Sequence, residues 1–303
     1  MMSRRARPGM PPGMLPRFKT AAERAADARR RTPGAMVLFD QFSDFRAQHI
    51  GSYFTTRGPG SATRMPAEYE PSQAWLITWN ASMGTGDPFM IDQIRAGWGV
   101  APLILATSDA GHRAWLEQKL RGAGLDPTDT AKVSFVTTPM DSIWARDFGP
   151  LSIVGVSAMG GPPTLAFVDF RYYHERVLDD QIPTALAKAW GINVYRPDME
   201  FEGGNFMNTG EGLCAASKGV LWANPQLVQS AVEQIYADYL GCKVTVFPTP
   251  LEGEGTGHID MFAKFSSDTT VLVGRYATAQ DSQNAKILND NAALFGKTKT
   301  PSG

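Results

Sequence analysis

The segment Asp141–Pro150, DSIWARDFGP, is the first of three short polar clusters on which the expected fold depends. The second cluster is Glu202–Asn205, EGGN, and the third is Gly257–Asp260, GHID. Each follows an apolar stretch typical of a buried strand. We expect the three turns to bring functional side chains to the ends of their strands.

The clusters recur at a nearly constant spacing. The interval from Asp147 to Glu202 almost equals the interval from Glu202 to His258. A period of about 50 residues, close to this interval, is typical of propellers and other repeat proteins, in which each repeat contributes to a shared axis. This period places a further cluster beyond Gly303.

The sequence between the clusters alternates strand and helix patterns. Helices are expected from Ser108, as an N-cap, to about Leu120, and from Asn224 to a stop at Gly241. Apolar runs predict strands over 74–79, 102–106, 132–137 and 244–247. Such alternation predicts an α/β protein.

Four side chains in the clusters suit one kind of chemistry. On a strand, His258 and Asp260 would face the same side because they are two residues apart. Together with Asp147 and Glu202 they would form a carboxylate-rich pocket, in which the acids repel one another unless a cation lies between them. That cation could be a metal ion or a planar guanidinium held by bidentate hydrogen bonds. A histidine there can transfer protons near neutral pH.

Two neighbouring side chains admit both a functional and a structural interpretation. Trp144 could pack against a flat guanidinium, or it could belong to the core, as most buried tryptophans do. Arg146 could line the pocket, or it could be an ion-pair partner that holds Asp147 or Glu202 in place. Both are kept as candidate substrate-binding residues.

Composition excludes several classes of protein. The chain has 303 residues, a formal net charge of −1 and 43% hydrophobic residues, enough for a sizeable core. It contains no run of 18 apolar residues that would predict a transmembrane helix. Two cysteines and four histidines are few for a disulfide-stapled fold or a cysteine- or histidine-based metal centre. The composition therefore disfavours a cysteine-based zinc site and a three-histidine metal centre.

The charge is unevenly distributed along the chain. Residues 1–35 contain nine Lys or Arg and only two acidic residues, and we expect this part to be a basic, disordered arm. A basic arm could also bind nucleic acid or anionic lipid, although neither is expected as a partner here. Prolines interrupt the only apolar stretch that resembles a signal peptide, so a cytoplasmic location is expected.

The three clusters, together with Arg64–Pro71 (RMPAEYEP), resemble the Porphyromonas-type peptidylarginine deiminases and agmatine deiminases. The resemblance extends over about residues 64–295. It implies the pentein fold, an α/β propeller of five αβ units around a pseudo-fivefold axis. It also implies hydrolysis of a guanidinium to a ureido group, with release of ammonia, through a covalent thiouronium intermediate on a cysteine.

The resemblance assigns a role to each cluster. Asp147 and Asp260 would bind the guanidinium nitrogens. His258 would protonate the departing ammonia and then activate water. Glu202 and Asn205 would shape and brace the site. The chemistry implied by the resemblance needs no metal, so no metal and no cofactor are expected.

The expected partners are a small cationic guanidino substrate or an arginine-containing peptide, without nucleic acid or membrane, and a homodimer is kept as an option. The segment Asp169–Arg176, DFRYYHER, is closer to the peptidylarginine branch. In that branch an Arg-x-Arg pair binds the carboxylate of a C-terminal arginine. Here Arg176 is present, but His174 occupies the first place, which removes one bidentate donor.

The catalytic cysteine of the family lies near its C-terminus, and neither Cys214 nor Cys242 matches that position. Both are expected to be small buried hydrophobes with inert thiols. We therefore expect residues 36–303 to form a deiminase domain that lacks its last unit and, with it, the nucleophile. Two alternatives remain: a protein that binds arginine or agmatine without converting it, and a metal-dependent hydrolase that uses the four clustered side chains.

Overall fold

The computed structural model describes residues 53, 55–59, 63–80, 87–155, 164–173 and 176–301. The expected basic arm at residues 1–35 and His174 lie outside these ranges. The chain divides into two compact units. One contains Ser72–Ala145, and the other contains Arg146–Gly303 together with the segment that ends at Pro71.

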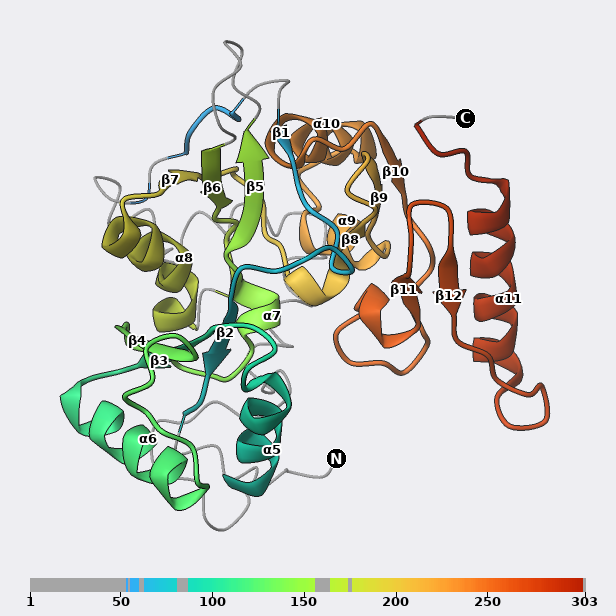
Figure 1. The fold of residues 1–303 in the computed structure, drawn as a ribbon. Helices are drawn as coiled ribbons and strands as arrows, with labels where there is room; N and C mark the ends of the chain where they lie inside the picture. Colours follow the sequence, from blue (N-terminus) through green and yellow to red (C-terminus); the bar gives the residue numbers. More distant parts are fainter. Residues whose placement is uncertain are drawn as a thin grey trace, which may run out of the picture. The chain divides into compact units, whose positions relative to one another are not determined.

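The first unit is a parallel sheet with two helices (Figure 1). Its strand order is β2-β3-β4, and the strands agree with the predicted ones to within one residue. The predicted helix after Ser108 is also present, but Asp109 is its N-cap and accepts a 2.8 Å hydrogen bond from the His112 amide. The elements are β2 (Trp75–Thr78), α5 (Asp87–Gly97), β3 (Leu103–Thr107), α6 (Ala110–Gly122) and β4 (Val133–Thr137).

The second unit begins with a mixed sheet of order β1-β5-β6-β7. The antiparallel pair β5–β6 follows directly after the first polar cluster, and α8 connects β6 to its parallel neighbour β7. The elements are β1 (Thr63–Arg64), α7 (Ala145–Phe148), β5 (Leu151–Gly155), β6 (Thr164–Val168), α8 (Val177–Trp190) and β7 (Asn193–Tyr195).

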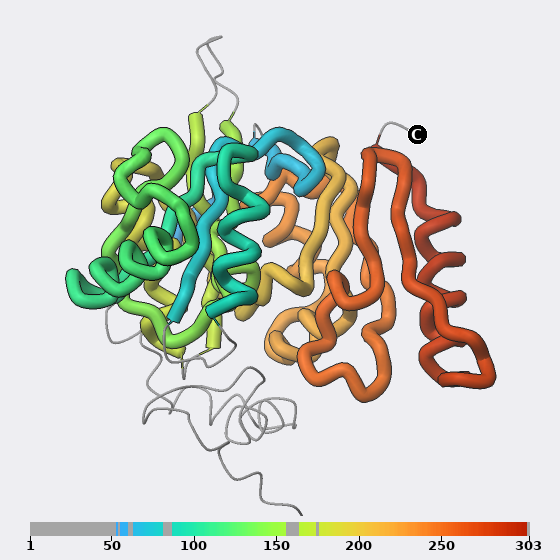
Figure 2. The backbone as a smooth tube through the Cα atoms, turned by 60° about the horizontal axis from the view of Figure 1, so that its bottom comes forward, coloured from blue at the N-terminus to red at the C-terminus, as the bar shows by residue number. Residues whose placement is uncertain are grey.

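Two smaller sheets complete the second unit. In Figure 2 the strands of β8–β10 lie between β5–β6 and β11–β12, with α11 on the outer side of β12. The elements are η2 (Gly203–Asn205), β8 (Met207–Asn208), β9 (Leu213–Ala215), α9 (Gly219–Ala223), α10 (Gln229–Leu240), β10 (Val244–Val246), η3 (Ile259–Met261), β11 (Ala263–Phe265), β12 (Val271–Val273) and α11 (Ser282–Lys297).

Strand β9 separates two hydrophobic clusters of the second unit. Cys214 packs into a cluster with Phe206 and Tyr236, whereas Leu213 and Ala215 belong to a cluster formed with β11 and α11. This is the alternation that a strand buried on both faces requires. Because β9 is fixed on both sides, it provides a rigid support for the turns at its ends.

The α/β class predicted from the sequence is confirmed. The four sheets of the described residues are open and contain two to four strands each, so closure into a five-unit propeller stays a prediction. Within the same residues, every helix is too short or too polar to cross a lipid bilayer.

The predicted helix start at Asn224 is wrong. Asn224 is the C-cap of α9, and α10 begins only at Gln229. The buried amide of Asn224 instead pairs with the backbone of Glu200, accepting from its N–H and donating to its C=O, both at 2.8 Å. The Asn224 side chain therefore makes a long-range contact with Glu200 in place of the helix N-cap that the local sequence pattern predicted.

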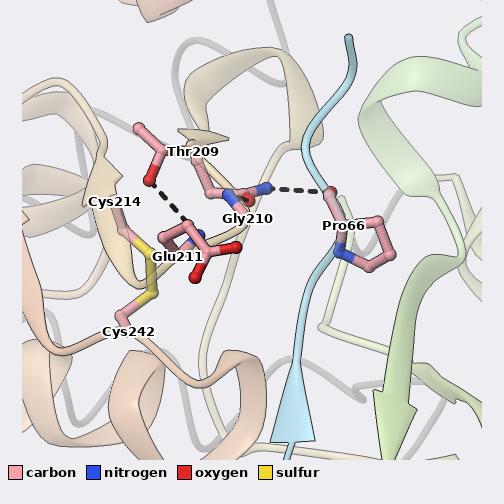
Figure 3. Close-up of a disulfide and its surroundings, with 7 residues drawn as sticks. Pro66, Thr209, Gly210, Glu211, Cys214 and Cys242 are labelled. Atoms are coloured by element: carbon pink, nitrogen blue, oxygen red, sulfur yellow. Dashed lines mark hydrogen bonds between the residues drawn. A yellow bond between two sulfur atoms is a disulfide. The ribbon is translucent and has the colours of Figure 1, made fainter. Parts of the chain in front are cut away.

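The expectation of two inert thiols is also wrong. Cys214 and Cys242 are buried, as expected, but they form a disulfide that joins β9 to the residue after the glycine stop of α10. Their Cα atoms are 5.8 Å apart, well within disulfide range. Figure 3 shows the bond beside the turn at Thr209–Glu211. The side-chain amide of Asn208, the residue before this turn, donates to the carbonyl oxygen of Pro66 at 3.3 Å.

Replacing Cys214 and Cys242 together by alanine should lower the free energy of unfolding by about 3 kcal/mol, because the bond closes a loop across 28 residues. Denaturant unfolding with and without reductant measures the effect. Reductant should destabilise the unchanged protein and leave the double variant unaffected. Two titratable thiols in the unfolded, unreduced protein would contradict the pairing.

Candidate active site

Three polar turns of the second unit meet at Gly204. A Cβ built on this glycine would lie 2.5 Å from His258 Nδ1, 2.7 Å from Asp147 Oδ1 and 3.0 Å from Asp260 Oδ2. Separations below 3.0 Å are closer than carbon tolerates, so this position requires a residue without a side chain. Side chains from turns that are far apart in the sequence are thus gathered around one backbone atom.

The expectation that His258 and Asp260 share a strand is wrong. His258 is the N-cap of the 3₁₀ turn η3, and Asp260 lies within that turn. The two still converge on Gly204, His258 being buried and Asp260 exposed. The turn therefore achieves the juxtaposition that strand periodicity was expected to produce.

His258 forms a buried contact with Glu202. Its Nε2 lies 2.6 Å from Glu202 Oε2, and the two side chains are only 7% and 9% exposed. The other ring nitrogen, Nδ1, lies 3.7 Å from Asp147 Oδ1. Burial lowers the pKa of His258, but the carboxylates of Glu202, Asp147 and Asp260 outweigh this and raise that pKa to about 9. The ring is therefore an imidazolium at neutral pH.

Asp147 is held from the opposite turn. The amide of Gly204 donates to its Oδ1 at 3.1 Å. Burial raises the pKa of Asp147 to about 6, against the attraction of His258, with the like charges of Glu202 and Asp260 adding to the rise. Asp147 is thus a carboxylate at neutral pH, and binding of a cation would favour the ionised form further.

Asn205 braces the turns from behind. Its Oδ1 accepts a 2.9 Å hydrogen bond from the amide of Ser217, at the end of β9. The hydroxyl of Ser217 in turn donates to the carbonyl oxygen of Gly257, next to His258. Asn205 is buried, so this bracing position fits one of the two roles that the resemblance implied.

Glu254 shapes the loop that leads to His258, and the sequence analysis missed it. Its carboxylate accepts hydrogen bonds from the amides of Thr256, Gly257 and His258. A carboxylate followed by a Gly-rich, Thr-containing loop is a signal for such a local cap.

Arg146 is an ion-pair partner, but of Glu68 and not of Asp147 or Glu202 as the structural interpretation expected. Its contact with substrate stays a prediction. Its Nη2 donates to the carbonyl oxygen of Phe206 at 2.9 Å, and its Nη1 forms an ion pair with Glu68. Glu68 also pairs with Lys264 of β11. Glu68 was not among the site residues predicted from the sequence, although this glutamate lies in the segment RMPAEYEP.

The remaining candidates are placed differently. Trp144 belongs to the first unit, where it is half-buried and its amide donates to Ser142 Oγ at 3.3 Å. Arg176 precedes α8 and is only 2% exposed, with its guanidinium 5.2 Å from the ring centre of Tyr173. Substrate contact by Trp144 and Arg176 stays a prediction.

Replacing Gly204 with alanine should displace His258 or Asp147, because the new Cβ would overlap both. We expect a loss of stability of about 1–3 kcal/mol and a lower His258 pKa, measured by thermal unfolding and by NMR titration of the imidazole. Gly296→Ala in α11, where a Cβ meets nothing within 4 Å, is the matched control. It should not destabilise the protein, because alanine favours a helix more than glycine does, and it should not shift the His258 pKa. Equal effects of the two substitutions would refute the packing argument.

The His258 pKa also predicts how stability varies with pH. A folded-state pKa near 9, above the ordinary value of 6.5, means that the contribution is complete below pH 6.5 and is lost as pH rises through 9. The shift corresponds to about 3 kcal/mol. Between pH 6.5 and 9 the unchanged protein should therefore lose more stability than His258→Asn, as measured by denaturant unfolding. Parallel curves would exclude the raised pKa.

Comparison with known proteins identifies the family to which the chain is similar. A model of the Porphyromonas-type peptidyl-arginine deiminase family matches residues 64–303. A Selenomonas ruminantium protein named "Putative agmatine deiminase" is 26% identical over 233 residues, which are 69% of this chain and 60% of the relative. A protein of the same name from Legionella pneumophila (strain Paris) is 25% identical over 255 residues, covering 79% of this chain and 70% of the relative. The chain thus spans only part of the length of these two curated relatives.

Solved structures show the same fold. The agmatine deiminase of Enterococcus faecalis superimposes with a TM-score of 0.67 at 22% identity, over 82% of this chain and 72% of that one. The agmatine deiminase of C. jejuni with substrate bound gives a TM-score of 0.64 at 16% identity, over 76% and 71% of the two chains. Because the family model covers well over half of its residues, the chain belongs to the Porphyromonas-type peptidyl-arginine deiminase family.

Proposed function

We propose that the protein acts on the guanidino group of an arginine-like substrate, in a hydrolysis that yields a ureido group and ammonia. The observation that carries this proposal is the cluster around Gly204, where Asp147, Asp260 and the His258–Glu202 pair converge. The family to which the chain belongs supports the same chemistry. The product would be citrulline from an arginine residue, or a carbamoyl amine from agmatine.

Binding depends on the surplus of negative charge. Asp147 and Asp260 supply carboxylates beside Gly204, and one imidazolium does not neutralise both of them and Glu202. A guanidinium presents several N–H donors in one plane and can satisfy two carboxylates at once. Asp260, the exposed member, would meet the substrate at the mouth of the site.

His258 is suited to both proton transfers. When a thiolate adds to the guanidinium carbon, the C–N bond breaks and the imidazolium gives its proton to the departing nitrogen, which leaves as ammonia. The neutral imidazole then takes a proton from water as the oxygen adds to the thiouronium carbon. The thiolate leaves with its electron pair while the added hydroxyl loses its remaining proton, which converts the released ammonia to ammonium. The ureido product and the imidazolium result. A pKa near 9 keeps the ring protonated for the first of these steps.

The thiolate does not come from Cys214 or Cys242, because both sulfurs are buried in a disulfide. We propose that residues 1–303 bind the guanidinium without converting it. Conversion would need a further unit of the fold that carries a cysteine, at the later position expected from the repeat and from the family.

The position of Arg176 restricts which guanidino compounds we propose as substrates. Its buried guanidinium lies against tyrosine rings, which disfavours capture of a C-terminal carboxylate. We therefore favour internal arginine residues or agmatine, which lack a free α-carboxylate. A homodimer and a cytoplasmic location stay predictions, and the disulfide counts against the latter because such bonds persist mainly in oxidising compartments.

The two alternatives differ in what they require. A protein that only binds arginine or agmatine would use the same site without catalysing a reaction. This is the behaviour that we propose for residues 1–303 alone. A metal-dependent hydrolase would need a ligand set, and the described part of the chain contains no group of three or more His, Cys, Asp or Glu arranged to hold a metal ion.

Calorimetry with agmatine, arginine and Nα-benzoyl-arginine tests the proposal on residues 1–303, with ammonia release measured in parallel. We expect binding without ammonia, and binding weakened about tenfold or more in Asp260→Asn, which loses a charge-assisted contact. Glu252→Gln, an exposed acid on the preceding loop, is the matched control and should bind normally.

Three results would count against the proposal. Absence of binding to every guanidino compound tested would refute the proposed substrate-binding site. Ammonia release that disappears in Cys214→Ala would make that cysteine the nucleophile. Activity lost to a chelator and restored by a metal ion would favour the metal-dependent hydrolase.

A further inference from the structure

Tyr173 lies behind the proposed site and belongs to none of its three polar clusters. Its hydroxyl donates a hydrogen bond to Glu202 Oε2. The same carboxylate oxygen lies 2.6 Å from His258 Nε2. Tyr173, Glu202 and His258 are all buried, so the three groups form a hydrogen-bonded row away from solvent.

We propose that Tyr173 is a positioning residue, which orients the Glu202 carboxylate and shares its charge while His258 gives up and regains its proton. A role of Tyr173 in catalysis rests on the proposed function, because it presupposes that His258 transfers protons during the reaction. The contact itself, and its effect on His258, are independent of that function.

The direction of the Tyr173–Glu202 hydrogen bond is fixed by chemistry. Burial and the neighbouring carboxylate raise the pKa of Tyr173 well above its ordinary value, so the phenol keeps its proton. An ionised carboxylate only accepts. Tyr173 therefore stabilises the negative charge of Glu202 in both protonation states of His258, and it weakens the hold of Glu202 on the imidazole proton.

The Tyr173 ring is held firmly in place. It stacks on Tyr172 with ring centres 4.3 Å apart, and the Arg176 guanidinium lies 5.2 Å from its centre. The Arg176 amide also donates to the Tyr173 carbonyl oxygen at 2.9 Å. Arg176 thereby gains a role in this chain that needs no substrate carboxylate: it supports the ring that holds Glu202.

Several charged groups face His258 and set its protonation. Glu202 faces Nε2, Asp147 and Asp260 face the Nδ1 side, and Glu254 accepts from the His258 amide. The hydroxyl of Tyr173 contacts Glu202 in this set, so its removal acts on His258 through Glu202.

The test is Tyr173→Phe, with the His258 pKa measured by NMR titration of the ring protons in the full chain. Without the hydroxyl, more of the Glu202 charge falls on the imidazolium, and we expect the His258 pKa to rise by about one unit. Tyr172→Phe is the matched control, because its hydroxyl lies 3.4 Å from Arg176 Nη1 rather than on Glu202. It should leave the His258 pKa unchanged.

An unchanged or lower His258 pKa in folded Tyr173→Phe, or an equal shift in Tyr172→Phe, would overturn the proposal. If Tyr173→Phe does not fold, the unchanged protein still provides a test. The Tyr173 hydroxyl proton should be slow to exchange, should resonate downfield, and should move when His258 titrates. Failure to detect that proton under conditions that reveal other buried hydroxyls would also overturn the proposal.

These measurements separate the two proposals. A shifted His258 pKa with no binding of guanidino compounds would support the role of Tyr173 and refute the proposed function. In a form that deiminates, Tyr173→Phe should move the basic limb of the kcat profile to higher pH, while Tyr172→Phe should not.

Discussion

A buried contact between an imidazolium and a carboxylate, His258 with Glu202, is the interaction on which the second unit depends. Taking either charge out of water alone would cost several kcal/mol, and a buried pair is tolerated only when its remaining hydrogen-bonding capacity is also satisfied. Tyr173 contributes a hydroxyl to Glu202, and Asp147 faces the other side of the imidazole ring. Loss of either His258 or Glu202 would leave an uncompensated charge in the interior.

The three polar turns contact one another through closely packed backbone atoms. A Cβ on Gly203 would lie 2.0 Å from the carbonyl oxygen of Arg146, so the EGGN turn can rest directly on the turn that carries Asp147. Gly204 leaves room for the charged groups, and Asn205 binds the end of β9 through Ser217. Both glycines have negative φ, so they are required by the closeness of other atoms and not by backbone conformation.

Local patterns predicted what local interactions decide. The strands and the helix after Ser108 followed from apolar runs and turn residues, whereas the convergence of the three polar clusters was predicted from their regular spacing. The predictions failed where a distant part of the chain takes over a side chain, as Glu200 does with Asn224 and as Cys242 does with Cys214. Tyr173 and Glu68 were missed for the same reason, since a buried tyrosine or a glutamate in a loop has no periodicity that reveals its partner.

Binding and conversion depend on different parts of this arrangement. The affinity that we propose for a planar cation would come from carboxylates whose positions are fixed by Gly204, His258 and Glu202, and none of these groups depends on a nucleophile. The covalent step needs a thiolate, and the disulfide removes both cysteines of residues 1–303 from that role. The charge surplus, and with it the proposed attraction for a guanidinium, would therefore exist before any thiolate is in place. Under the proposed function, substrate recognition is a property of the charge cluster itself, and the nucleophile determines only whether the bound group is hydrolysed.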